Sequence, residues 1–323
     1  MNDESLSLAH PSSSSRNQPS KLLVIRLSAF GDVIHTIPAV VALREALPQT
    51  DLAWAVEPAY GQLVEIVAGV RAIRVSLKKW SLARIGEALR SVRGHEDVID
   101  FQGLIKSALM ARASGAARRY GFARDVIREK PAALFINRPV TIASSRHVVD
   151  WNLDLARACA PAITSIPAVD FAPFADDPSG KLRALGNRVI LLPGAGRPEK
   201  QWPVERFSEL ARQIGSDVLV AWGPGEERVA HAIGAEVAPA TSFRELAFLL
   251  RHARLVIGGD TGPLHLAAAL GVPVAGLYGP TNPGRNGPYG QLDRVVESFT
   301  TTKSMTSISV DDVLRLILKI KPR

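Results

Sequence analysis

The most informative segment of the chain is Gly258-Gly259-Asp260-Thr261-Gly262-Pro263-Leu264-His265. An apolar run predicts a strand at 254–257, and the periodicity of 264–270 predicts a helix. The first turn of a helix has backbone N–H groups without partners and the positive end of the helix dipole, so it binds anions, and glycine lets them come close. Asp260 or Thr261 could instead only cap the helix. The segment alone leaves both interpretations open.

Other polar residues also follow predicted strands, namely Asp32, Gln102, Lys200 and Glu226. Ligands of open α/β sheets bind at the carboxyl ends of the strands, so we expect these side chains to face a ligand. For Asp32 alone, a helix cap is the stronger interpretation. The neighbouring Gly31 favours function, because glycine allows a ligand to approach closely.

The loop 193–203 contains two glycines and two cations between a predicted strand and a predicted helix. Gly194 and Lys200 in such a loop would hold a diphosphate. The loop lacks the Gly-Lys-Ser/Thr ending of a Walker A motif, and Gly-x-Gly alone is a weak signal. The alternative is that Lys200 is a solvated surface cation.

Two further segments are basic, and both precede residue 150. The first is Lys78-Lys79-Trp80, and the second set comprises Arg118, Arg119, Arg124, Arg128, Lys130, Arg138, Arg146 and His147. Such runs are usually solvated faces, but their position apart from the diphosphate loops indicates a second anionic ligand. His147 has no neighbouring histidine or carboxylate at metal-ligand spacing, so we predict no metal site.

Composition is that of a globular protein with basic character. The chain has 323 residues, 46% of them hydrophobic, a formal charge of +8 and one cysteine, Cys159. This charge favours anionic partners, which could be nucleic acid, an anionic bilayer surface or a phosphorylated substrate. One cysteine excludes an internal disulfide framework. Residues 1–20 are rich in Ser, Asn and Pro without a signal-like apolar run, so we expect a disordered tail and a cytoplasmic protein.

Strands and helices alternate along the chain, which predicts an α/β fold. Strands are predicted at 21–27, 52–56, 98–101, 188–192, 218–222, 254–257 and 274–277, and helices at 33–47, 82–92, 105–114, 204–214, 243–251, 264–270 and 310–320. The breaker-rich stretch near 173–186 predicts a linker between domains 21–172 and 187–300. The last part, 301–323, contains a helix that could pack back on the first domain.

In these motifs the chain resembles the family 9 glycosyltransferases, the ADP-heptose transferases of the lipopolysaccharide inner core. The resemblance runs from about 21 to about 290 and rests on several motifs in one order: Leu-Ser-Ala-Phe-Gly-Asp-Val-Ile-His-Thr-Ile-Pro-Ala at 27–39, Trp-Ala-Val-Glu at 54–57, Val-Ile-Asp-Phe-Gln-Gly-Leu-Ile-Lys-Ser-Ala at 98–108, Lys-Gln-Trp-Pro at 200–203, Asp-Thr-Gly-Pro-Leu-His-Leu at 260–266 and Tyr-Gly-Pro-Thr-Asn-Pro-Gly at 278–284. The stretch 98–108 and the Lys-Lys-Trp segment are most similar to the heptosyltransferase I branch.

The resemblance implies a GT-B fold, in which two Rossmann-like domains face each other across a cleft. The first domain would bind the acceptor and the second the nucleotide sugar. It implies an inverting transfer of L-glycero-D-manno-heptose from ADP-heptose to the Kdo of lipid A. The enzyme would be cytoplasmic and peripheral to the inner face of the inner membrane, with no cofactor, nucleic acid or obligate protein partner.

The resemblance also implies roles for single residues. Asp32 would be the general base, and Lys200 would stabilise the leaving ADP. The residues that match positions around the donor are Gly194, Lys200, Glu226, Asp260, Thr261, Gly262 and His265, with Glu226 on the ribose. Those assigned to the acceptor are Lys78, Lys79, Gln102, Arg128 and His147. Ala195, Gly196 and Pro263 depart from the family pattern.

Three alternatives remain beside this interpretation. Another family 9 transferase would use a different sugar or acceptor. A nucleotide-sugar epimerase also has paired Rossmann-like domains but would convert the donor without an acceptor. A nucleic-acid-binding protein is favoured by the charge alone, because the chain has neither a helix-turn-helix nor an RRM motif and few aromatic residues.

Overall fold

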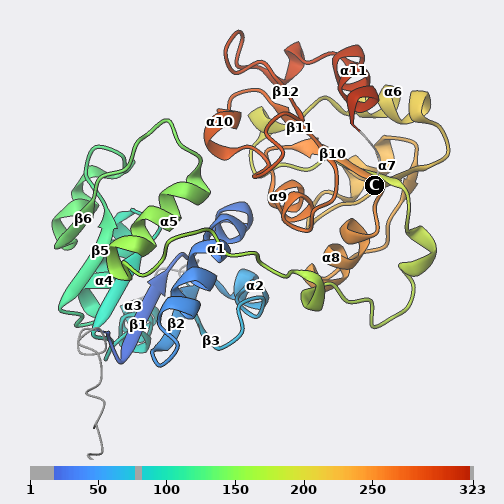
Figure 1. Cartoon of the computed structure of the whole chain (residues 1–323). Helices are drawn as coiled ribbons and strands as arrows, with labels where there is room; N and C mark the ends of the chain where they lie inside the picture. Colours follow the sequence, from blue (N-terminus) through green and yellow to red (C-terminus); the bar gives the residue numbers. More distant parts are fainter. Residues whose placement is uncertain (1–17, 77–81, 321–323) are drawn as a thin grey trace, which may run out of the picture.

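The computed structural model describes residues 18–76 and 82–320, which form two α/β domains (Figure 1). The first has a six-stranded parallel sheet in the order β3-β2-β1-β4-β5-β6. Its elements are β1 (Lys21–Ile25), α1 (Phe30–Ala46), β2 (Asp51–Val56), η2 (Pro58–Tyr60), α2 (Gly61–Val64), β3 (Val70–Arg74), α3 (Leu82–Ser91), β4 (Asp97–Asp100), α4 (Ile105–Ala113), β5 (Arg118–Phe122), η3 (Lys130–Phe135), β6 (Arg138–Val140) and α5 (Val148–Cys159).

Strand β1 is buried on both faces because helices cover both sides of the sheet. Leu22 and Val24 pack in one apolar cluster with α1 and α5, whereas Leu23 and Ile25 pack in another with α3 and α4. Alternate side chains of a strand point to opposite faces, so a strand between two helical layers is apolar throughout. This explains the continuous run that predicted the strand.

The second domain repeats the arrangement with the strand order β12-β11-β10-β7-β8-β9. Its elements are β7 (Val189–Leu192), η6 (Pro198–Lys200), α6 (Val204–Ile214), β8 (Val218–Val220), α7 (Glu227–Ala232), β9 (Glu236–Val237), α8 (Phe243–Arg251), β10 (Leu255–Gly259), α9 (Gly262–Ala269), β11 (Val274–Tyr278), α10 (Pro283–Asn286), β12 (Val295–Glu297), η7 (Met305–Ser307) and α11 (Val310–Lys319). The prediction of two Rossmann-like domains is therefore confirmed.

Helix α11 packs within the second domain, on α6, β11 and β12 (Figure 1). Its buried Val310 and Val313 join the apolar cluster of Trp202 and Phe207, and the Trp202 indole donates to the carbonyl of Ile308 at 2.9 Å. The helix therefore does not cross to the first domain, where we considered that it could pack. Its apolar stripe is already covered by the second sheet.

The two domains are in direct contact and are also joined by the chain. Helix α1 packs on α9, and one apolar cluster continues from the first domain into the second. The connection contains η4 (Ala172–Phe174) and η5 (Arg183–Leu185), and η4 packs on α8. Pro19 and Ser20, which we assigned to the tail, belong to the first domain, because their carbonyl and amide bond to Thr50 and Glu96.

Within residues 18–76 and 82–320, the helices are all too short or too polar to cross a bilayer.

Candidate active site

A cleft of about 1050 Å³ lies between the domains, and loops from both of them line it. These loops follow β1, β2, β7, β8 and β10, so the cleft faces the carboxyl ends of the strands, as in other open α/β sheets. The structure brings most predicted site residues to this cleft: Asp32, Gly194, Lys200, Glu226, Asp260, Thr261, Gly262 and His265.

Asp32, near the start of α1, forms an ion pair with Arg26. The Arg26 guanidinium lies 2.7 Å from one carboxylate oxygen of Asp32, and the amide of Ala29 donates to the other at 3.3 Å. Arg26 is buried and also donates to the carbonyl of Phe101 at 2.5 Å. The Asp32 side chain is 38% exposed, so it is held by Arg26 and still accessible from the cleft.

Lys200 is positioned by the carboxylate of Asp260. Its ammonium lies 2.5 Å from one oxygen of Asp260, and the other oxygen accepts from His265 Nε2 at 3.0 Å. Burial raises the pKa of Asp260, but the interactions with His265 and Lys200 outweigh burial and lower the pKa to about 2. Asp260 therefore stays ionised at neutral pH and orients both side chains.

The first turns of α1 and α9 meet at Gly31 and Gly262. A Cβ atom on Gly31 would lie 2.8 Å from the His265 ring, and one on Gly262 would lie 2.4 Å from the Phe30 ring. Only glycine lets the two helix ends approach this closely. Each helix brings the positive end of its dipole, so this part of the cleft favours negative charge.

Thr261 is the N-cap residue of α9, but its side chain makes no capping hydrogen bond. Its hydroxyl is buried and has no partner among the described residues. The Thr261 side chain therefore does not cap the helix, in contrast to the alternative interpretation of the sequence. The hydroxyl is left able to donate to a ligand.

Gly194 makes room for Glu226. The Glu226 carboxylate accepts from the amide of Gly223 at 2.8 Å, and a Cβ atom on Gly194 would lie 2.0 Å from it. We expected a glycine at position 194 to make room for a diphosphate. The structure shows a further need for glycine here, because a side chain would overlap Glu226. The β7 and β8 loops meet here, which places the Glu226 carboxylate on the second-domain side of the cleft.

Three aromatic side chains, which the sequence analysis did not single out, form a wall of the cleft. The rings of Phe30 and Phe243 meet edge to face at 4.8 Å, and Tyr60 stacks on Phe30 at 6.4 Å. Phe30 and Tyr60 belong to the first domain and Phe243 to the second. Their apolar surface joins the domains beside Asp32.

Three histidine rings pack together where the domains meet. The ring of His35 lies 4.3 Å from that of His265 and 5.3 Å from that of His147. Burial, followed by the nearby histidines and Arg26, holds the pKa of His35 well below its usual value. Burial also lowers the pKa of His147 to about 4. Both rings are therefore neutral at pH 7.

Three of the predicted acceptor residues, His147, Gln102 and Arg128, do not line the cleft. His147 is buried, and its Nδ1 accepts from the Val149 amide. Its Nε2 donates to the carbonyl of Gly287 at 3.0 Å, and this hydrogen bond links the first domain to the second. Gln102 accepts from the Leu27 amide at 2.9 Å and links β4 to β1. Arg128 is exposed beside Glu129. Lys78 and Lys79 lie outside the described residues.

The position of His147 is a correction. Internal hydrogen bonds occupy both of its ring nitrogens, which we expected to bind an acceptor. Its residue type gave no means to distinguish a ligand contact from a bond to distant backbone. For Gln102, the Leu27 amide holds the side-chain oxygen, and a contact of this residue with the acceptor stays a prediction. Arg26, in contrast, has a sequence signal that we overlooked, since this cation directly follows an apolar strand. The structure buries it.

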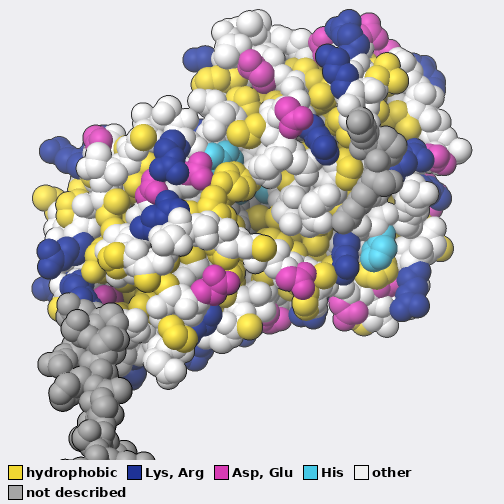
Figure 2. Space-filling model, viewed as in Figure 1, with side chains coloured by type: hydrophobic (Ala, Val, Ile, Leu, Met, Phe, Trp, Pro, Cys, Tyr) yellow, Lys and Arg dark blue, Asp and Glu magenta, His cyan; other side chains and the backbone are white. Residues whose placement is uncertain are grey.

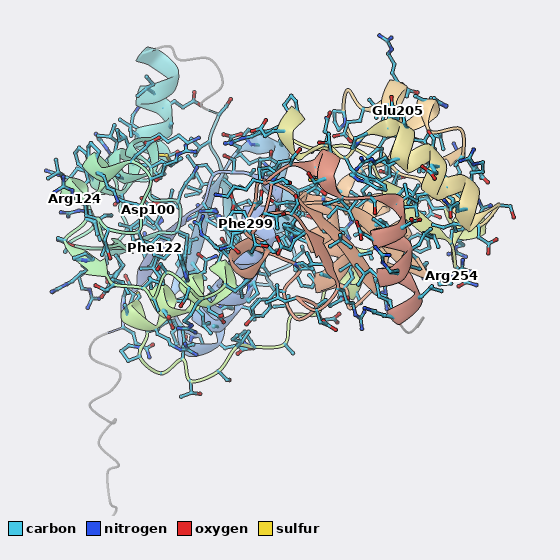
Figure 3. All side chains as sticks on the ribbon, turned by 90° about the horizontal axis from the view of Figure 1, so that it is seen from above. Asp100, Phe122, Arg124, Glu205, Arg254 and Phe299 are labelled. Carbon is cyan, nitrogen blue, oxygen red and sulfur yellow. The ribbon has the colours of Figure 1, made fainter. Side chains whose placement is uncertain are left out.

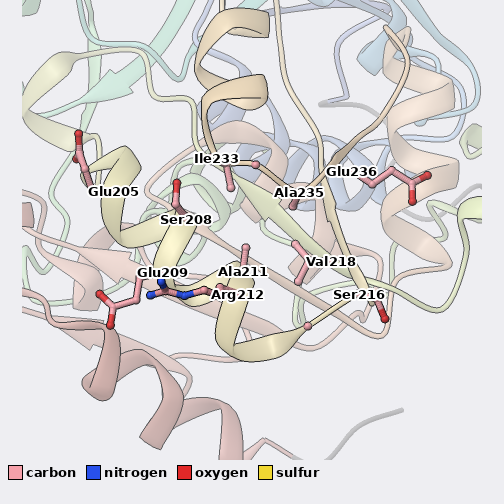
Figure 4. Close-up of a pocket in the computed structure, with 12 residues that line it drawn as sticks. Glu205, Ser208, Glu209, Ala211, Arg212, Ser216, Val218, Ile233, Ala235 and Glu236 are labelled. Carbon is pink, nitrogen blue, oxygen red and sulfur yellow. The ribbon is translucent and has the colours of Figure 1, made fainter.

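A second cavity, of about 820 Å³, lies in the second domain between α6, β8 and β9 (Figure 4). It is lined by small and charged side chains that include Ser208, Arg212 and Glu236. The predicted site residues that the structure describes lie elsewhere, so this cavity has no part in the active site proposed below.

Comparison with known proteins places the chain in one family. Residues 82–313 match the model of glycosyltransferase family 9 (heptosyltransferase). Lipopolysaccharide heptosyltransferase 1 of Escherichia coli K12 is 31% identical over 85% of this chain and 92% of its own length. The E. coli heptosyltransferase WaaC with ADP is similar in structure, with a TM-score of 0.77 and 29% identity over 93% of this chain and 99% of its own. The WaaC structure with ADP-2-deoxy-2-fluoro heptose gives 0.75 and 28%, over the same shares of the two chains.

The two parallel sheets facing a common cleft are thus the GT-B fold that the resemblance implied. The matched residues include the β7 loop, the β10–α9 junction and most of the second domain. The chain belongs to glycosyltransferase family 9, the heptosyltransferases.

Proposed function

We propose that this heptosyltransferase moves L-glycero-D-manno-heptose from ADP-heptose to the Kdo of lipid A, with inversion at the anomeric carbon. One observation carries the proposal: a carboxylate from one domain, Asp32, and a cation at a helix start in the other, Lys200, line the same cleft. Similar E. coli structures were solved with ADP and with an ADP-heptose analogue, which supports this donor class.

In the proposed reaction Asp32 is the general base. Its carboxylate takes the proton of an acceptor hydroxyl while the hydroxyl oxygen attacks the anomeric carbon and the bond to the diphosphate breaks. A base in hydrogen-bond reach contributes about 10²–10⁴-fold to such a step. Arg26 acts through Asp32, since the ion pair at 2.7 Å orients the carboxylate while part of it remains exposed.

The departing ADP gains negative charge, which fixed donors stabilise. Lys200, the Thr261 hydroxyl and the free amides of the first turn of α9 are the donors that the cleft offers. Asp260 keeps the Lys200 ammonium in place, and two of its three N–H groups remain for a phosphate oxygen. Glu226 suits the ribose, because a carboxylate accepts from paired hydroxyls.

The test is Asp32→Asn, which keeps the shape and removes the base. We expect kcat to fall by about 10²-fold or more, while the Kd for ADP-heptose changes little. Kinetics and calorimetry measure the two quantities. Asp176→Asn, on the interdomain connection, is the matched control and should leave both unchanged. Preserved turnover with lost donor binding would contradict the role of Asp32.

The choice of sugar has its own test, a panel of nucleotide sugars scored by product formation. We expect ADP-heptose to give product only when the acceptor is present. A preference for another nucleotide sugar would assign another family 9 activity, and conversion of the donor without acceptor would indicate an epimerase. We also infer that the enzyme needs no cofactor and works at the inner face of the inner membrane.

A further inference from the structure

Exposed apolar side chains gather on one side of the first domain. In the described part of the chain, large hydrophobic side chains are exposed at Ile105, Leu109, Leu134, Ile166, Val229, Leu292 and Leu318. Three of these belong to only two elements, α4 and η3, and Leu134 is 84% exposed. Single exposed apolar residues are ordinary, whereas a cluster of them marks an interaction surface.

Helix α4 and η3 pack against each other, so the three exposed side chains lie on neighbouring elements. The amide of Ile105, at the start of α4, donates to Glu129, just before η3, at 2.8 Å. Ile105 and Leu109 are four residues apart and share a helix face. We call Ile105, Leu109 and Leu134 the α4–η3 patch.

The segment that carries the α4–η3 patch is rich in cations. Residues 105–138 carry eight Lys and Arg against two Asp and Glu, a net charge of +6 in a chain whose formal charge is +8. Exposed members of this set are Arg112, Arg124, Arg128, Lys130 and Arg138. Figure 2 shows dark blue cationic and yellow apolar side chains side by side over the first domain. Arg124 lies at the end of the molecule away from Glu205 and Arg254 of the second domain (Figure 3).

We propose that the α4–η3 patch docks the enzyme on the surface of an anionic lipid bilayer. Apolar side chains enter the interface between headgroups and acyl chains, while the cations pair with lipid phosphates. A second copy of this chain would fit the apolar patch but would bring like charges together. The charge therefore selects a lipid surface over self-association.

This inference rests on the proposed function for its purpose, since a lipid-anchored acceptor must reach the cleft from a membrane. The start of α4 follows β4 and the loop 123–129 follows β5, so both lie at the carboxyl edge of the sheet. Asp32 follows β1 at the same edge, and β1 is the direct neighbour of β4. The Ile105 end of the patch therefore adjoins the proposed base, whereas Leu134 lies near the end of η3, which leads into the amino end of β6.

The test is co-sedimentation of the full chain with vesicles of phosphatidylglycerol and phosphatidylcholine in equal parts, compared with phosphatidylcholine alone. We expect binding to the anionic vesicles that weakens in high salt. Leu134→Glu should lower the partition coefficient about tenfold or more, because it removes an apolar contact and adds a repelled charge. Arg112→Gln should lower it about fivefold.

Matched controls come from the second domain. Leu318 on α11 is 86% exposed, so Leu318→Glu makes the same change at equal exposure, and Arg212→Gln on α6 removes a cation far from the patch. Both should bind like the unchanged protein. A melting curve of each variant verifies the fold, and Leu109→Gln provides a second variant of the patch.

Two results would overturn the proposal: no binding to anionic vesicles, or an equal loss in Leu318→Glu and Leu134→Glu. Self-association that Leu134→Glu abolishes, without vesicle binding, would assign the patch to a second copy instead. The measurement uses no sugar substrate, so vesicle binding can fail while transferase activity stands. Conversely, the Asp32→Asn result can fail without affecting vesicle binding.

Discussion

Asp32 lies beside a permanent cation, which sets its role at the scale of single residues. Arg26 also donates to the carbonyl of Phe101, directly after β4, so the Asp32 carboxylate is fixed relative to the sheet. Lys200 is fixed in the same way by Asp260. Each reacting group is therefore held in position by an oppositely charged neighbour before the substrate binds.

Gly194→Ala tests the donor side at this scale. The added methyl would lie 2.0 Å from the Glu226 carboxylate, so Glu226 must move. Loss of a hydrogen bond to a charged group should raise the Kd for ADP about tenfold. Gly196→Ala is the control in the same loop, since no atom lies within 4 Å of its added methyl. Equal affinities of the two variants in calorimetry would show that Glu226 does not bind the nucleotide.

The position of a residue after a strand was enough to predict Asp32, Lys200 and Asp260 at the cleft, because all parallel strands end at the same edge. Pairing between distant side chains was not predictable in this way. His147 has the residue type of a ligand-binding group, yet its partner is a carbonyl 140 positions away. The contact depends on how the domains pack, which local patterns do not encode.

At the scale of elements, helices with a clear apolar face were predicted most accurately. The bounds 204–214 and 243–251 agree with α6 and α8, whose buried residues recur at helical spacing. Helix α1 starts three residues before the predicted 33, and α9 starts two before 264. In both cases the extra residues include the glycine at the contact between the domains, where packing rather than periodicity defines the helix start. Short edge strands such as β9 gave no pattern at all.

Gly262→Ala tests this contact. Its methyl would lie 2.4 Å from Phe30, so the starts of α1 and α9 must separate or Phe30 must turn. Overpacking of this kind costs about 1–3 kcal/mol. We expect a lower Tm and a kcat reduced about tenfold, because Asp32 and Lys200 move apart. Gly86→Ala in α3, where the nearest atom is the end of Arg90 at 3.9 Å, should cause neither change. Unchanged kinetics in Gly262→Ala would contradict a role for close approach.

At the scale of the whole molecule, buried neutral histidines lie at the contact between the domains. The pKa of His147 is about 4, against 6.5 for the free side chain. Between these values the unfolded chain binds more protons, so the free energy of unfolding falls as the pH falls from 6.5 towards 4. His147 alone accounts for about 3 kcal/mol of this loss at most.

His147→Gln tests this pH dependence, since glutamine retains a donor for Gly287 and does not titrate. Below pH 6.5 we expect the unfolding free energy of His147→Gln to fall less than that of the unchanged protein. Urea titrations at several pH values measure this difference. His231→Gln, at an exposed position on α7, is the control. A parallel pH dependence for all three proteins would contradict the account.

The comparison between variants is necessary because another buried group acts in the opposite direction. Burial raises the pKa of Asp100 from 3.8 to about 6, although hydrogen bonds from Gln102, Ser107 and Gly103 lower it in part. Between these values the folded chain binds more protons, so Asp100 favours folding at lower pH. This effect is common to all three proteins and cancels in the difference.

The most direct measurement is a crystal structure with a non-transferable ADP-heptose analogue and a Kdo-containing acceptor. We predict the diphosphate at Lys200 and the first turn of α9, and the attacking hydroxyl within hydrogen-bond distance of Asp32. A diphosphate bound elsewhere, or an acceptor hydroxyl out of reach of the Asp32 carboxylate, would contradict the proposed mechanism.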